Sequence, residues 1–163
     1  MILTLAQQQT LKAYILSVPE LSAQPLNGDG AYAIAAVINQ PAVPSFVVWR
    51  GATSVQEIEQ NGFAWSQLDS VPAAKYRIWE RLTASGTINP SKVNVRQGIN
   101  DFCKDASNAV LTALKDSITP HLKRDATVVE QMFATGTGTT VAPATMTVEG
   151  SLSYQDVEAA RKL

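Results

Sequence analysis

The residues with the greatest intrinsic reactivity are one histidine and one cysteine. His121 follows Pro120, and Cys103 lies in the sequence NDFCKD. A thiol paired with an imidazole could act as the nucleophile of a hydrolase. No catalytic signature surrounds Cys103, however, and a free cysteine usually packs as a small buried hydrophobic side chain. We therefore predict that the chain is not an enzyme and that His121 lies in a solvent-facing loop.

An acidic pair and a glycine-rich stretch suggest two further kinds of site. Asp101 and Asp105 are spaced to share one face of a helix, where they could bind a divalent cation. We favour a solvated helix face, because Lys104 lies between them. The stretch GTGTT, residues 136–140, lacks the lysine and the directly following helix of a phosphate-binding loop. We predict no metal site, no cofactor and no catalytic residue.

The composition is that of a globular domain with few charges. The chain has 163 residues, of which 45% are hydrophobic and 17% are charged, and its formal net charge is −1. This length is sufficient for a hydrophobic core, and the near-neutral charge argues against recruitment of nucleic acid by a general basic field. The low charged fraction is typical of buried subunit interfaces. No apolar run reaches the roughly 18 residues of a membrane span, and the N-terminus lacks a signal-peptide pattern.

Helical periodicity and capping signals predict a mainly α fold with a compact helical core domain over residues 1–134. The Ala-rich, nearly all-apolar stretch 31–39 predicts a buried helix. Further helices are predicted after Pro72, from about residue 95 and, with amphipathic spacing, over 106–118. The tryptophans at 49, 65 and 79 are expected to be core or interface anchors. Capping boxes predict four more helix starts, at Thr4–Gln7, Ser54–Glu57, Thr127–Glu130 and Ser153–Asp156.

The last part of the chain departs from this helical pattern. Residues 135–163 begin with a Thr- and Gly-rich tract and end in a short capped helix. Between them, Thr-Val and Met-Thr-Val flank Ala-Pro-Ala, which predicts two short strands around a turn. Because an isolated hairpin is marginally stable in water, we predict a C-terminal arm that docks on neighbouring subunits. The residues expected to dock are Thr137, Thr139, Val141, Met146, Val148, Leu152, Tyr154, Val157, Arg161 and Lys162.

Two adjacent basic pairs could contact nucleic acid or acidic partners. Lys123-Arg124 precedes the helix predicted from Thr127, so a helix-turn-helix over residues 106–134 is one interpretation. That helix, in ATVVEQMFA, offers no Arg, Lys or Asn to base edges, which argues against it. Arg161-Lys162 could pair with acidic groups of a docking partner. A small DNA-binding or packaging regulator therefore stays an alternative.

Three stretches together resemble a widespread family of small virion proteins of tailed bacteriophages. They are FVVWR, IWERLTASGTINPSKVNVRQGI and ATVVEQMFATGTGTTVAPATMTVEGSLSYQDVEAA. The resemblance extends from about Ala31 to the end of the chain, and its most specific part is FATGTGTTVAPATMTVEGSLSYQDV. The general plan, a helical core followed by an arm, is similar to that of head–tail adaptor proteins.

The resemblance implies a structural protein of the virion neck, made in the cytoplasm of a bacterial host. It implies a homo-oligomeric ring of about twelve copies between the head and the tail. The expected partners are the portal protein, a tail or stopper protein and, transiently and without sequence specificity, the genomic DNA in the lumen; no membrane is involved. Adaptors carry no catalytic residues, so none is transferred. A tail terminator, a minor tail protein and a decoration protein are the alternatives within the virion.

Overall fold

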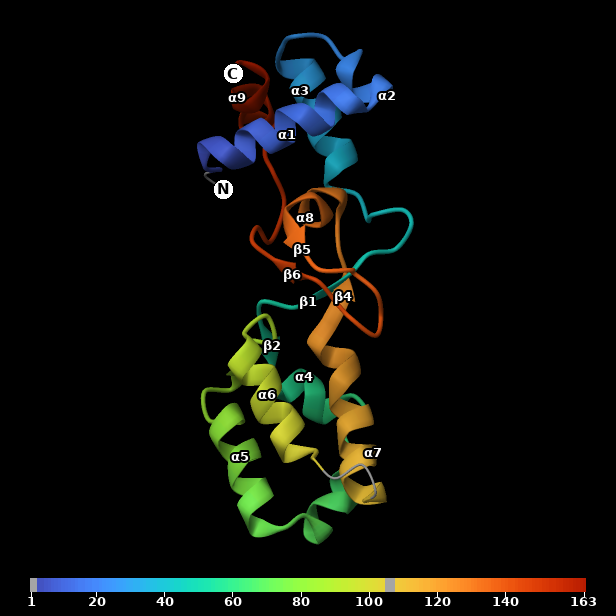
Figure 1. Ribbon diagram of the computed structural model, residues 1–163, viewed down its shortest axis with the longest axis vertical. Helices are drawn as coiled ribbons and strands as arrows, with labels where there is room; N and C mark the ends of the chain where they lie inside the picture. Colours follow the sequence, from blue (N-terminus) through green and yellow to red (C-terminus); the bar gives the residue numbers. More distant parts are fainter. Residues whose placement is uncertain (1–2, 105–107) are drawn as a thin grey trace. The chain divides into compact units, whose positions relative to one another are not determined.

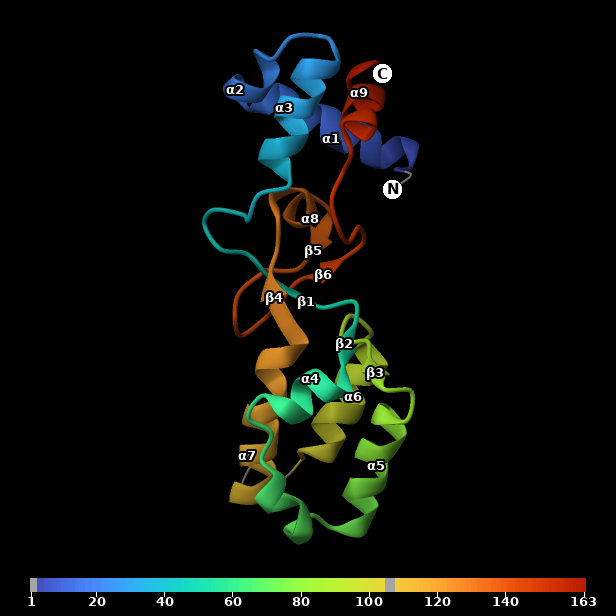
Figure 2. The same ribbon diagram turned by 180° about the vertical axis from the view of Figure 1, so that it is seen from behind.

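The computed structural model describes residues 3–104 and 108–163, and its fold is mainly α, as predicted. Figures 1 and 2 show the chain from two opposite sides. The chain forms two compact units: unit 1 is Met1–Val48 with Asp125–Leu163, and unit 2 is Trp49–Arg124. Unit 2 is therefore an insertion between the two halves of unit 1. The chain leaves unit 1 within β1 (Val47–Trp49) and returns within β4 (Lys123–Asp125), and these two strands pair.

Unit 1 combines helices from both ends of the chain. Three of its helices begin at the predicted capping boxes, in which the hydroxyls of Thr4, Thr127 and Ser153 accept from the amides of Gln7, Glu130 and Asp156, each at 3.3 Å. A short antiparallel hairpin pairs Ala134 with Met146. The elements of unit 1 are α1 (Leu5–Ser17), α2 (Pro19–Ser22), α3 (Gly28–Ile38), α8 (Val128–Phe133), β5 (Ala134–Thr135), β6 (Thr145–Met146) and α9 (Tyr154–Arg161).

Unit 2 has its own hydrophobic core. The core centres on an aromatic stack in which the Trp79 ring lies between Phe63 and Phe102, with centroid distances of 5.6 and 5.3 Å. The side chains of Ile58, Leu114 and other aliphatic residues complete it. The elements are β2 (Thr53–Ser54), α4 (Val55–Gln60), the 3₁₀ helix η1 (Trp65–Ser70), α5 (Ala73–Thr83), β3 (Thr87–Ile88), α6 (Val93–Phe102), α7 (Ala109–Ile118) and the 3₁₀ helix η2 (Thr119–Leu122).

The two compact units do not coincide with the predicted division into a core of residues 1–134 and an arm of residues 135–163. In the structure, α9 packs against α1 and α3. Val148, Leu152, Val157 and Ala160 are buried in the core that these helices share. The reason is that these four apolar side chains fill the space between α1, α3 and α8, so the segment completes unit 1 instead of leaving it.

One local prediction also differs from the structure, and one alternative interpretation is excluded. The hairpin pairs residues 134–135 with 145–146, so the predicted Thr-Val strand at residues 140–141 is part of the loop instead. The described part of 106–134 is no helix-turn-helix, because α7 belongs to unit 2 and α8 to unit 1. The helix α7 ends at Ile118, the 3₁₀ helix η2 with Pro120 follows, and the extended strand β4 begins at Lys123. None of the described helices has the length and apolar character needed to cross a membrane.

Candidate functional site

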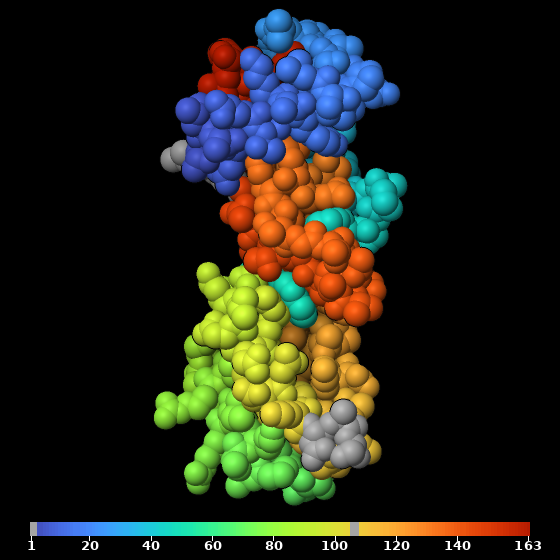
Figure 3. Space-filling model, viewed as in Figure 1, coloured from blue at the N-terminus to red at the C-terminus, as the bar shows by residue number. Residues whose placement is uncertain are grey.

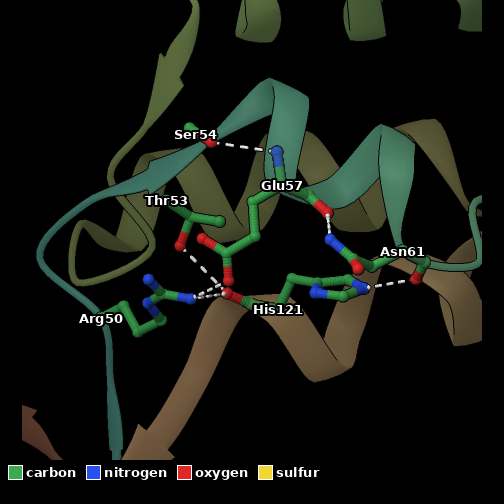
Figure 4. Close-up of polar contacts among 6 residues, drawn as sticks. All are labelled: Arg50, Thr53, Ser54, Glu57, Asn61 and His121. Atoms are coloured by element: carbon green, nitrogen blue, oxygen red, sulfur yellow. Dashed lines mark hydrogen bonds and ion pairs between the residues drawn. The ribbon is translucent and has the colours of Figure 1, made fainter.

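His121 takes part in a polar network of unit 2 that joins α4 to η2 (Figure 4). Its Nε2 lies 3.0 Å from the carbonyl oxygen of Asn61, so this nitrogen carries the proton and donates. Its own carbonyl oxygen accepts from the Thr53 hydroxyl at 3.0 Å and from Arg50 at 3.4 Å. His121 is half-buried and lies in η2, not in the solvent-facing loop that we predicted.

The charged members of this network neutralise each other. Arg50 forms an ion pair with Glu57, and its hydrogen bond holds the pKa of the Glu57 carboxyl below the ordinary value. The Glu57 amide donates to the Ser54 hydroxyl at 2.9 Å, which caps α4. The Glu57 side chain is engaged by Arg50, so the predicted capping box forms only in this half. The network therefore ties two elements of unit 2 together.

Cys103 lies apart from this network, at the C-terminal end of α6. It is buried in the core of unit 2, and no interaction joins it to His121 in the described part of the chain. Burial raises the pKa of the Cys103 thiol from its ordinary value of 9.0 to about 11. A thiol that stays protonated is a poor nucleophile, so the geometry gives no support to a Cys103/His121 pair. Asp105, the second carboxylate of the acidic pair for which we expected a solvated helix face, lies outside the described residues.

The raised pKa of Cys103 predicts a specific pH dependence of stability. The folded chain retains the proton above pH 9, where the unfolded chain loses it, so this contribution is fully present below about pH 9 and is lost as the pH rises toward 11. Urea unfolding at neutral pH and near pH 10 should show this loss of unfolding free energy. In Cys103→Ala, the free energy of unfolding should decrease less between these two pH values than in the parent chain. An equal decrease in the variant and the parent chain would contradict the assignment.

The residues predicted to dock on a partner are divided between the core and the surface of unit 1. Val148, Leu152 and Val157 are core residues, and Met146 packs against a small cluster around Ala144. The Tyr154 ring stacks on Tyr32 of α3 with a centroid distance of 4.1 Å. These five side chains thus contact the chain's own helices and strands.

Hydrogen bonds attach residues 147–152 to α3 and α8. Asn39 at the end of α3 donates to the Leu152 carbonyl at 2.9 Å and accepts from its amide at 3.0 Å. Buried Glu130 accepts from the Gly150 amide at 2.9 Å, and the Thr147 hydroxyl donates to the Phe133 carbonyl at 2.7 Å. The long-range partners explain why local sequence reasoning missed this attachment.

The other predicted docking residues are at the surface. Thr137 and Thr139 bond to Ala142 within their own loop, at 3.0 and 2.9 Å, while the Val141 side chain is 94% exposed. The Arg161 guanidinium donates to the carbonyls of residues 24 and 25 at 2.7 and 2.8 Å. Lys162 forms an ion pair with Glu158, one turn earlier in α9, at 2.8 Å.

Comparisons of the chain with models of protein families, with curated proteins and with solved structures give no match.

A second exposed valine, which the sequence analysis did not single out, accompanies Val141. Val43 is 92% exposed in the loop of residues 41–46. This loop adjoins the loop of residues 136–143, because the Val47 amide donates to the Gly138 carbonyl at 2.7 Å. Figures 1 and 2 show the two loops projecting to the same side of unit 1. The sequence signal for this pair is the similar tripeptides AVP and VAP, at residues 42–44 and 141–143. We call the loops of residues 41–46 and 136–143 the valine loops.

Tight packing holds the valine loops in place. Gly138 has a φ of +66°, and a Cβ atom there would lie 2.1 Å from the Phe46 ring, so only glycine allows this approach. Ala144 bridges to buried Val48 beneath the loops. Two fixed loops with exposed apolar tips offer a surface that a partner could cover, since exposed apolar side chains gain free energy when they are removed from water.

Proposed function

We propose that the chain is a structural protein of a tailed-phage virion, which assembles as a ring at the head–tail interface and conducts DNA through its lumen. The observation that carries the proposal is the pair of valine loops, because they offer a fixed apolar contact surface on unit 1. The sequence resemblance described above supplies the virion context. The loops take over the role first assigned to a free arm, because Val148, Leu152 and Val157 of that segment are buried in unit 1 while Val141 stays exposed.

The charge distribution between the units supports contacts between copies. Unit 1 contains three basic and seven acidic residues, and unit 2 contains ten basic and seven acidic residues, so their formal charges are −4 and +3. Opposite charges on different units favour a head-to-tail contact between copies, and such a contact closes into a ring when the rotation allows it. Exposed ion pairs contribute about 0–1 kcal/mol each. Charge would therefore orient the copies, and burial of apolar loops would provide most of the affinity.

The copy number of the chain in purified virions tests the proposal. Quantitative mass spectrometry relative to the portal protein should give about twelve copies, as closed cyclic symmetry matched to the portal requires. A value near half of that would assign the chain to the tail end of the neck. Hundreds of copies would assign it to the capsid surface or the tail tube. Absence from the particle would contradict the structural proposal and favour the DNA-binding regulator, for which binding by unit 2 should weaken steeply with salt.

Substitution of both loop valines should separate assembly from folding. The double variant Val43→Asp/Val141→Asp should fold normally, because both side chains are almost fully exposed, yet it should lose ring assembly and incorporation into virions. Native mass spectrometry of the purified chain and of particles measures both effects. Val93→Asp, at an exposed valine of unit 2, is the matched control and should assemble normally. Equal behaviour of the two variants would rule out the valine loops as the contact surface.

A further inference from the structure

All three basic residues of unit 1 line two adjoining hollows beside α9. The larger hollow has a volume of about 160 Å³, and the smaller one about 70 Å³. Leu26 and Arg161 line both, so the two form one groove. The larger is otherwise lined by Asn27, Ala31, Glu158 and Lys162, and the smaller by Lys12, Ile15, Leu16 and Ser22. In Figure 3, the red atoms of α9 lie against the blue atoms of the N-terminal helices.

The positive charge of this groove is only partly neutralised. Arg161 donates to two backbone carbonyls, which fix the guanidinium in place but leave its charge uncompensated. Lys12 has no carboxylate partner among the residues that the structure describes. Lys162 pairs with Glu158. The groove therefore carries an excess of two positive charges within a unit whose formal charge is −4.

Apart from the charged residues and the polar Asn27 and Ser22, the lining of the groove is apolar. Leu26 is 88% exposed and Leu16 is 64% exposed, and both stand at its border. The larger hollow is about the size of cavities that accept a benzene-sized group. The groove thus combines space for one apolar side chain with two cations that lack a carboxylate partner in the described part of the chain.

We propose that this groove binds a short acidic peptide segment of a partner protein. One apolar side chain of the segment inserts beside Leu26, and a carboxylate is bound by Arg161 and Lys12. Arg presents several N–H donors in a planar fork suited to a carboxylate. A nucleic acid is a poorer match, because the acidic remainder of unit 1 repels a polyphosphate chain while two local cations suit one or two carboxylates. The inference uses residues other than the valine loops and stands whether or not the chain forms a ring.

A titration of the full chain with a defined peptide tests the inference. The probe is acetyl-Asp-Leu-Asp-Leu amide, and acetyl-Asn-Leu-Asn-Leu amide is the uncharged control. Two-dimensional NMR should show saturable shifts of the backbone amides of Leu26, Asn27 and Lys162 with the acidic peptide. Its affinity should fall with added salt and should exceed that of the control by about fivefold, as expected for a partly exposed ion pair. Equal affinities, or shifts confined to other regions, would overturn the inference.

Variants and competing anions complete the test. Lys12→Gln, which removes an ion pair, and Leu26→Ser, which removes apolar contact area, should each weaken binding about fivefold. Neither should change the thermal unfolding midpoint, because neither side chain is part of the core. Arg161→Gln should abolish binding, but it also removes the anchor of residues 24 and 25, so the first two variants decide the question. Unchanged binding by both would contradict the inference. Inorganic phosphate or a short single-stranded DNA that binds the same residues more tightly than the acidic peptide would also overturn it.

Discussion

A chain ending at residue 134 is expected to lose the fold of unit 1. The deletion removes Val148, Leu152, Val157 and Ala160, each at most 5% exposed, from a core that contains α1 and α3. Full burial of a valine or leucine stabilises the folded state by about 1.5–3 kcal/mol, and the empty space left behind adds to the loss. The total is comparable to the whole stability of a small domain, about 5–15 kcal/mol. Circular dichroism and urea unfolding of the truncated chain should show the loss of helix.

A short truncation provides the control for this deletion. Removal of residues 162–163 takes away only exposed side chains and the Lys162–Glu158 ion pair, so it should change the free energy of unfolding by less than about 1 kcal/mol. The single substitution Val157→Asp, at a position with no exposed surface, should mimic the long deletion. A chain of residues 1–134 that keeps the helix content of unit 1 and unfolds cooperatively would instead support a separate docking arm.

Local signals in the sequence predicted the starts of several helices correctly. The boxes at Thr4–Gln7, Thr127–Glu130 and Ser153–Asp156 form with both of their hydrogen bonds, because all the groups involved lie within one turn of chain. The box at Ser54–Glu57 forms in one half only, since Arg50 engages the Glu57 carboxylate. Arg50 lies on the segment before β2 and competes successfully with the local interaction.

The division of the chain could not be predicted in the same way. The chain passes between the units within β1 and β4, and neither strand has the Gly- and Pro-rich composition that marks a linker. Apolar spacing in residues 148–160 is equally compatible with docking on a partner and with packing on α1 and α3. The groove beside α9 depends on Lys12 and Arg161, which come from opposite ends of the chain. Only the folded arrangement of unit 1 brings their charges together.

Trp79→Ala is expected to destabilise unit 2 by about 3–5 kcal/mol, the usual cost of removing a large aromatic side chain from a core. The Trp79 side chain is 4% exposed and stacks between Phe63 and Phe102. The substitution therefore leaves an empty space at the centre of the core and removes two aromatic contacts. Urea unfolding followed by far-UV circular dichroism measures the effect, because tryptophan fluorescence changes with the substitution itself.

Trp65→Ala is the matched control, because it removes the same side chain from a position that is 53% exposed. It loses the hydrogen bond from Trp65 Nε1 to the Glu59 carbonyl, at 3.1 Å, and an edge contact with Phe63, so its expected cost is about 1 kcal/mol. The cores of unit 1 and unit 2 share no residue. Trp79→Ala should therefore shift the transition of unit 2 to lower urea while that of unit 1 changes little. Equal losses in both units, or equal effects of the two tryptophan substitutions, would contradict separate cores.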